Sequence, residues 1–227
     1  MSDFSDTTIM EVKTPTVSFG ELMEGGAAEI YVGPNKKLYT IPRALLCYHS
    51  EYFKRSLNSG SVEAAEGAIH LFTDDPETFI LLLEWMYKGT LRVFENFCWE
   101  ADDYRTALQQ TCLVLCKLFC MADRLIIPGV EDYIVSQLNR AFDSAGDDFP
   151  IDSATIMAVY NNTPERSAFQ KYLLEKLTVN LISPTGHHIE KYKELVEGPD
   201  AIPGFAVNLI AKMKDFRSHE YWCKAVL

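Results

Sequence analysis

Residues 29–91 constrain the fold of this chain more than any other stretch. The run 29–32 is rich in β-branched and aromatic residues, which favour a strand. Residues 33–37 include Gly, Pro and Asn, which favour a turn, and 38–41 suit a half-buried return strand. Pro42 lacks a backbone N–H, so we expect it to stop this strand and to occupy the first position of a helix.

Two further short elements follow the predicted helix at 43–48. Ser50 is placed to cap a second helix over 51–58, because a Ser hydroxyl accepts a hydrogen bond from the first turn. After a polar break at 58–61, the run 69–72 is a plausible third strand.

The helix after this strand has the clearest signals in the chain. Asp75 is placed as its cap, Pro76 suits its first position, and Gly89 is well placed to end it. Its apolar residues recur at spacings of three and four, which predicts one buried stripe. The stripe consists of Phe79, Leu82, Leu83 and Met86.

Five short segments between residues 32 and 89 have an order that is more specific than any one of them. They are Val32-Gly33, Ala44-Leu45-Leu46, Ser50-Glu51-Tyr52-Phe53, Asp74-Asp75-Pro76-Glu77-Thr78-Phe79 and Trp85-Met86-Tyr87-Lys88-Gly89. Together they resemble the BTB/POZ domain, in the form common in filamentous fungi. The resemblance implies an α+β fold in which helices cover a small three-stranded sheet. We expect this domain at 18–142, with its best-matching core at 27–91.

The resemblance also implies a dimer interface. The family usually has an Asp and a His where this chain has Ala27 and Pro42, whereas Arg43 keeps the basic position of a charged pocket found at that interface in some members. Glu29 could replace the missing acid, as a hypothesis, because it lies on the same strand face as Ala27.

A short helix capped by Ser18 would precede the first strand. In the resembling family, the equivalent helix packs against the partner of a homodimer. Phe19, Leu22 and Met23 therefore either contact a second copy or cover the sheet of their own monomer.

The family's cullin-3 adaptors contact the cullin through a hydrophobic residue, any residue, and then Glu. The corresponding residues here are Ser61, Val62 and Glu63, so the Glu is present and the hydrophobic anchor is replaced by Ser. An alignment shifted by one residue would let Val62 serve as the anchor. The resemblance thus implies cullin-3 as a possible protein partner.

Two closing helices are expected at 101–142, with Pro128 and Gly129 at the joint between them. The first is so apolar from Cys112 to Met121 that it should be buried on most sides. The aromatic and acidic residues of 94–104 would form either a binding loop or a loop that packs its own aromatic rings.

A small, polar and acidic run at 143–148 predicts a boundary, after which we expect an all-helical C-terminal extension at 147–227. The helical segments expected in it are 153–160, a helix starting at Thr163 with Phe169, Leu173, Leu177 and Leu181 on one side, 189–196 and 205–216. At the other end, the polar residues 1–17 are expected to form a disordered arm.

Charge and hydropathy exclude several classes of partner. The net charge of −11 argues against nucleic acid, which is bound through Lys and Arg. No apolar run reaches the length of a membrane span, and the first thirty residues lack the pattern of a secretory signal. We therefore expect a protein of the cytoplasm or nucleus.

Metal binding and catalysis are not expected. Cys112, Cys116 and Cys120 span eight residues of helix, about 12 Å, whereas sulfurs on one zinc lie within about 4 Å of one another. No Cys or further His near His187 and His188 in the sequence would complete a metal site. No nucleophile elbow, phosphate loop or dinucleotide fingerprint occurs, so we expect neither an enzyme nor a cofactor.

The sequence therefore favours a protein-interaction module that self-associates, binds an adaptor partner, or does both. It could act as a substrate adaptor of a cullin-3 ubiquitin ligase. The alternatives are a structural homodimer without ligase partners, or an enzyme or small-molecule binder with a cleft between the BTB/POZ domain and the helical extension.

Overall fold

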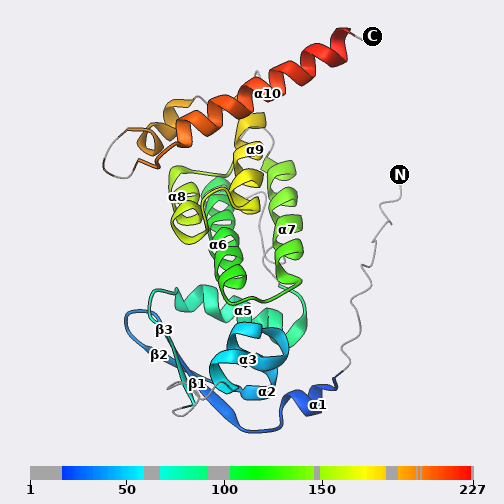
Figure 1. Cartoon of the computed structure of the whole chain (residues 1–227), viewed down its shortest axis with the longest axis vertical. Coiled ribbons are helices and arrows are strands. Elements are labelled where there is room, and N and C mark those ends of the chain that lie inside the picture. Colours follow the sequence, from blue (N-terminus) through cyan, green and yellow to red (C-terminus); the bar gives the residue numbers. More distant parts are fainter. Residues whose placement is uncertain are drawn as a thin grey trace.

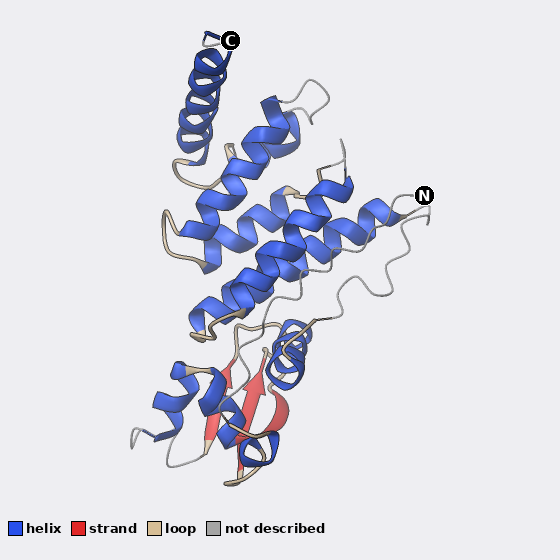
Figure 2. Cartoon of the chain, turned by 90° about the vertical axis from the view of Figure 1, so that its right-hand side faces the viewer, coloured by secondary structure: helices blue, strands red, loops and turns tan. Residues whose placement is uncertain are grey.

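The computed structural model describes residues 17–58, 67–91, 103–145, 149–182, 189–197, 199 and 201–225. A small sheet lies at one end of an elongated molecule, and helices continue away from it toward the C-terminus (Figures 1 and 2). The elements before residue 92 are α1 Phe19–Leu22, β1 Ala27–Val32, β2 Lys37–Pro42, α2 Arg43–His49, α3 Glu51–Asn58, β3 Ala68–Leu71 and α5 Pro76–Lys88. The later elements are α6 Tyr104–Arg124, α7 Val130–Ala145, α8 Ser153–Asn162, α9 Ala168–Ile182, the 3₁₀ helix η1 Ile189–Leu195 and α10 Phe205–Ala225.

The three-stranded sheet has the order β2-β1-β3. β1 pairs with β2 in antiparallel fashion and with β3 in parallel fashion. On β1, Ala28, Ile30 and Val32 are buried, while Ala27 and Glu29 are exposed, so one face of the strand packs on the core. The sheet with its covering helices confirms the predicted α+β fold.

Pro42 differs from the prediction. It is the last residue of β2, opposite Ala27, and it is the N-cap of α2 instead of its first helical residue. The next N–H, that of Arg43, still donates to the carbonyl of Gly26 at 3.0 Å, so the pairing continues past the proline. This is possible because β2 is an edge strand, where alternate backbone N–H groups point away from the sheet.

The predicted ends of α5 are confirmed. The Asp75 carboxylate accepts from the N–H of Thr78 at 3.1 Å, Pro76 is the first residue, and Gly89 ends the helix in the left-handed conformation with a φ of 68°. Phe79, Leu82 and Met86 are buried. The rings of Trp85 and Tyr133 lie 5.3 Å apart and connect α5 to α7.

One continuous hydrophobic core runs from the sheet through α6 to α9 and α10. The residues of α6 contact α5 and α7 as well as α8, which confirms the prediction that this helix is buried on most sides. The ring of Phe119 on α6 stacks on that of Phe169 on α9, with centroids 3.7 Å apart. The helices after residue 149 therefore pack on the same core as the sheet.

Two predictions for the C-terminal half need correction. Helix α7 continues through Ala145, so the first part of the predicted run at 143–148 is helical; the position of a domain boundary remains a prediction. The helix expected from Thr163 begins instead at Ala168. The Thr163 hydroxyl donates to the carbonyl of Val159 on α8, and the Ser167 hydroxyl caps α9 by accepting from Gln170.

None of the helices in the described part of the chain combines the length and the apolar composition needed to cross a bilayer.

Candidate protein-interaction surfaces

Helix α1 exposes one of its three apolar side chains. A capping box holds the helix: the Ser18 hydroxyl accepts from the N–H of Glu21, and the Glu21 carboxylate accepts from the N–H of Ser18. Leu22 is buried and Met23 packs against the core, whereas Phe19 is 61% exposed. Leu22 thus covers its own monomer, Met23 does so in part, and Phe19 is the most exposed apolar side chain of the three.

Arg43, the fourth residue predicted for the dimer interface, binds the end of the next helix. Its guanidinium donates to the carbonyl of Leu57 and, at 3.1 Å, to Oδ1 of Asn58. Glu29, the hypothetical acidic partner, accepts instead from the hydroxyl of Tyr31 at 2.7 Å. Each of the two charged groups therefore has another partner.

The predicted cullin contact, Ser61-Val62-Glu63, lies outside the described residues, as do the aromatic loop before Asp103 and the pair His187-His188. Their roles remain predictions.

A groove of about 400 Å³ lies between two corners of the fold. One wall is the corner between α2 and α3, and the other is the turn between α6 and α7. The lining residues of the first wall are Cys47, Tyr48, His49, Glu51 and Lys54, and those of the second are Asp123, Ile126, Ile127, Pro128 and Glu131. Such a volume is enough for one or a few side chains of a partner.

Ser50 fixes the first wall. Its hydroxyl accepts from the N–H of Phe53 at 3.0 Å, which confirms the predicted cap of α3, and donates to the carbonyl of Leu125 at 2.5 Å. Leu125 belongs to the second wall's turn. One buried hydroxyl therefore caps a helix and sets the spacing between the two walls.

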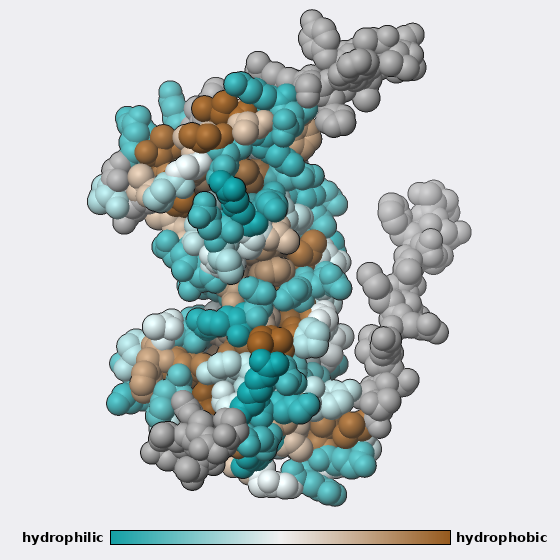
Figure 3. Space-filling view, viewed as in Figure 1, coloured by the Kyte–Doolittle hydropathy of each residue, from teal (hydrophilic) through white to brown (hydrophobic). Residues whose placement is uncertain are grey.

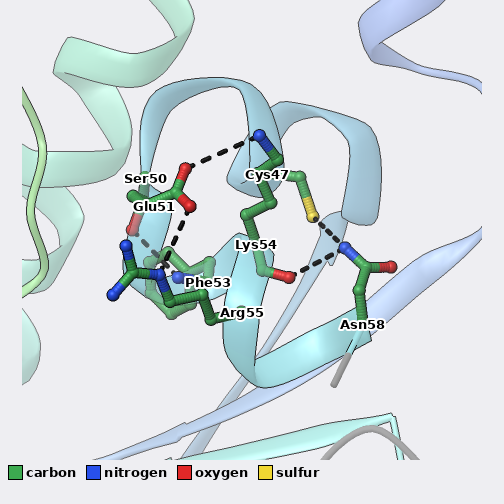
Figure 4. Close-up of polar contacts among 7 residues, drawn as sticks. All are labelled: Cys47, Ser50, Glu51, Phe53, Lys54, Arg55 and Asn58. Atoms are coloured by element: carbon green, nitrogen blue, oxygen red, sulfur yellow. Dashed lines mark hydrogen bonds and ion pairs between the residues drawn. The ribbon is translucent and has the colours of Figure 1, made fainter. Parts of the chain in front are cut away.

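Polar contacts hold the charged side chains of α3 against the helix (Figure 4). The Glu51 carboxylate lies 3.6 Å from Lys54 Nζ and 3.3 Å from Arg55 Nε. At the other end of the helix, the amide of Asn58 donates to the carbonyl of Lys54 at 2.8 Å and contacts the sulfur of Cys47. The charge of Glu51 is thus balanced within α3.

Ile126 ends α6 in an unusual backbone conformation. Its φ of 51° is left-handed, which is a genuine outlier for a β-branched residue and costs about 1–2 kcal/mol. The N–H of Ile126 donates to the carbonyl of Asp123, and that of Ile127 donates to the carbonyl of Ala122. This hydrogen-bond pattern is the helix ending that normally has Gly at the position of Ile126.

The second wall is acidic. Burial raises the pKa of the Glu131 carboxyl, and the negative charges of Asp123 and Asp132 raise it further. In the first wall, burial lowers the pKa of His49, although a hydrogen bond with the backbone of Met86 acts in the opposite direction. The imidazole is therefore mainly neutral at pH 7, and the carboxylates dominate the electrostatics of the groove.

The three cysteines of α6 lie in the core and not at a surface. Burial raises the pKa of Cys112 and of Cys120 to about 12 and that of Cys116 well above its usual value. Among the residues that the structure describes, no group of three His, Cys, Asp or Glu side chains is arranged to hold a metal ion.

The model of the BTB/POZ domain family matches residues 28–133. The chain contains a BTB/POZ domain. This family consists of protein-interaction domains, so the fold and the general function agree with the resemblance in the sequence. No curated protein sequence matches the chain.

The groove lies wholly within the BTB/POZ domain, because all its lining residues fall inside the matched segment. It is therefore not the cleft between domain and extension that the small-molecule alternative requires. Sequence reasoning missed the groove and the exposure of Tyr48 and Ile126 in it. One signal was present: 125–127 is an apolar run where a turn between helices usually contains Gly or Asn.

Proposed function

We propose that the chain is a protein adaptor whose BTB/POZ domain binds its partner across the groove between the α2–α3 corner and the α6–α7 turn. The observation that carries this proposal is the exposure of two large apolar side chains in the groove: Tyr48 is 40% exposed and Ile126 is 48% exposed. Apolar side chains in a recess surrounded by charges are typical of protein interfaces, where aromatic residues contribute much of the binding energy.

Cullin-3 is the partner class that the family resemblance favours. Glu63 keeps the acidic residue of the cullin motif, and its segment follows directly on α3, whose residue Lys54 lines the groove. In this proposal, Tyr48 and Ile126 supply the apolar contact that Ser61 cannot make. The chain would then act as a substrate adaptor of a cullin-3 ubiquitin ligase.

Light scattering coupled to size exclusion tests this function, with the chain alone and then mixed with the N-terminal domain of cullin-3 from the same organism. We expect a complex, and calorimetry should show at least about tenfold weaker binding for Tyr48→Ser and for Glu63→Ala. Tyr87→Ser is the matched control, because Tyr87 is 39% exposed on α5 and lies outside the groove. If cullin-3 causes no shift in mass, the ligase function is wrong.

Self-association through α1 is a second candidate, favoured by the 61% exposure of Phe19. A dimer would have a mass of about 51 kDa, twice the 25.7 kDa of the chain. Phe19→Ser should convert it to the monomer, whereas Val207→Ser, at a residue 70% exposed on α10, should not. A chain that is monomeric at all concentrations excludes the homodimer.

A further inference from the structure

Adjacent residues at the end of α6 have opposite surroundings. Ile127 is 1% exposed and belongs to the core, whereas Ile126 is 48% exposed and lines the groove. The side chain of Ile126 therefore contributes little apolar burial to the core. Its left-handed backbone is strained, and glycine would satisfy the same helix ending without strain. Strain that the fold does not need is a feature of binding sites.

The charges around Ile126 define what can bind beside it. Glu51 is balanced by Lys54 and Arg55, but no Lys or Arg of the described residues lies within ion-pair distance of Asp123 or Glu131. Arg124, next to Asp123 in the sequence, donates instead to Asp74. Within the described part of the chain, the second wall of the groove therefore presents carboxylates without a Lys or Arg partner, close to an exposed apolar side chain.

We propose that the groove binds a protein segment in which an apolar side chain is adjacent to a Lys or Arg. The apolar side chain contacts Ile126 and Tyr48, and the cation pairs with Asp123 and Glu131. This inference rests on the proposed function, because it assumes that the groove is the docking site, and it adds the chemistry of the partner. An acidic segment is disfavoured there by like-charge repulsion.

A library of random peptides of about twelve residues, displayed on phage and selected on the full chain, tests this chemistry. Ile126→Gly is the counter-selection variant, so that only peptides that need the Ile126 side chain remain. We expect the selected peptides to share Lys or Arg beside Leu, Ile, Met or an aromatic residue. Acidic peptides, or no enrichment over a support without protein, would contradict the proposal.

The binding of one selected peptide, synthesised with a fluorescent label, is then measured by anisotropy. We expect Ile126→Gly to weaken binding at least about tenfold while its melting temperature equals or exceeds that of the unmodified chain. The double variant Asp123→Asn/Glu131→Gln should also weaken binding at least about tenfold and reduce its dependence on salt. The controls are Ile80→Ser on α5, where Ile80 is 44% exposed, and Glu165→Gln, where the carboxylate is exposed.

These variants separate the two proposals. Cullin-3 binding that is unchanged by Ile126→Gly and by the double variant leaves the adaptor function in place, but it overturns the groove as the docking site and, with it, the peptide chemistry. If both variants weaken peptide binding but the chain does not bind cullin-3, the peptide chemistry is supported and the ligase function is wrong. A melting temperature that falls in Ile126→Gly also contradicts the inference, because Ile126 would then serve the fold.

Discussion

The hydroxyl of Ser50 donates a hydrogen bond of 2.5 Å to the backbone carbonyl of Leu125, which lies 75 residues further along the chain. The same oxygen accepts from the N–H of Phe53 and so caps α3. Because Ser50 is at the α2–α3 corner and Leu125 precedes Ile126, this contact joins the two walls of the groove. The geometry of the site and the stability of the domain therefore depend on one buried side chain.

Ser50→Ala should lower the free energy of unfolding by about 2 kcal/mol, since it removes a helix cap and leaves the Leu125 carbonyl buried without this donor. Urea unfolding followed by circular dichroism measures the change. Ser144→Ala is the matched control: Ser144 is exposed and bonds within its own helix, so its loss should cost less than about 0.5 kcal/mol. Equal effects of the two variants would contradict the role of Ser50.

Gly33→Ala should destabilise the chain more than Gly25→Ala. Both glycines have left-handed backbones, with φ of 76° and 85°, which alone cost alanine about 1 kcal/mol. A Cβ on Gly33 would also lie 3.0 Å from Cγ of Pro76, at the start of α5, whereas a Cβ on Gly25 meets nothing within 4 Å. Thermal unfolding of both variants measures the difference in stability. Similar decreases in melting temperature would show that the contact with Pro76 relaxes freely.

Stability should fall as the pH drops through 6.5, in part because of His49. The pKa of His49 in the folded chain lies below its usual value of 6.5, so over this range the unfolded chain takes up a proton that the native chain does not. His49→Gln should therefore flatten the decrease in melting temperature between about pH 7.5 and 5.5. An unchanged slope in this variant would assign the acid sensitivity to other groups.

The cysteines of α6 should resist alkylation in the native chain. Cys112 and Cys116 are fully buried with raised pKa values, so few thiolates form and reagent cannot reach them. Cys47 is partly exposed and is the internal reference. Iodoacetamide labelling at about pH 8, read by peptide mass spectrometry, should modify Cys47 before the α6 thiols, which should react only in denaturant. Labelling of Cys112 at the rate of Cys47 would show that the core opens easily.

Local signals in the sequence predicted the parts of the fold that depend on nearby residues. Helix caps and helix ends involve residues that are at most four positions apart, so they can be predicted without a structure. The examples here are the caps by Ser18, Ser50 and Asp75 and the helix end at Gly89. Two helix starts were predicted wrongly, at Pro42 and at Thr163. The pairing of β2 with β1 and the bond from Thr163 to Val159 overrode the local preference there.

The sequence by itself determined the BTB/POZ domain, because its pattern of strands, helices and caps is local and ordered. Tertiary structure decided which apolar residues remain outside. Leu22 and Met23 have the composition of an interface, yet packing against their own core covers them and leaves Phe19 exposed. The groove depends on long-range packing as well. Its two walls are about seventy residues apart in the chain, and the bond from Ser50 to Leu125 holds them together.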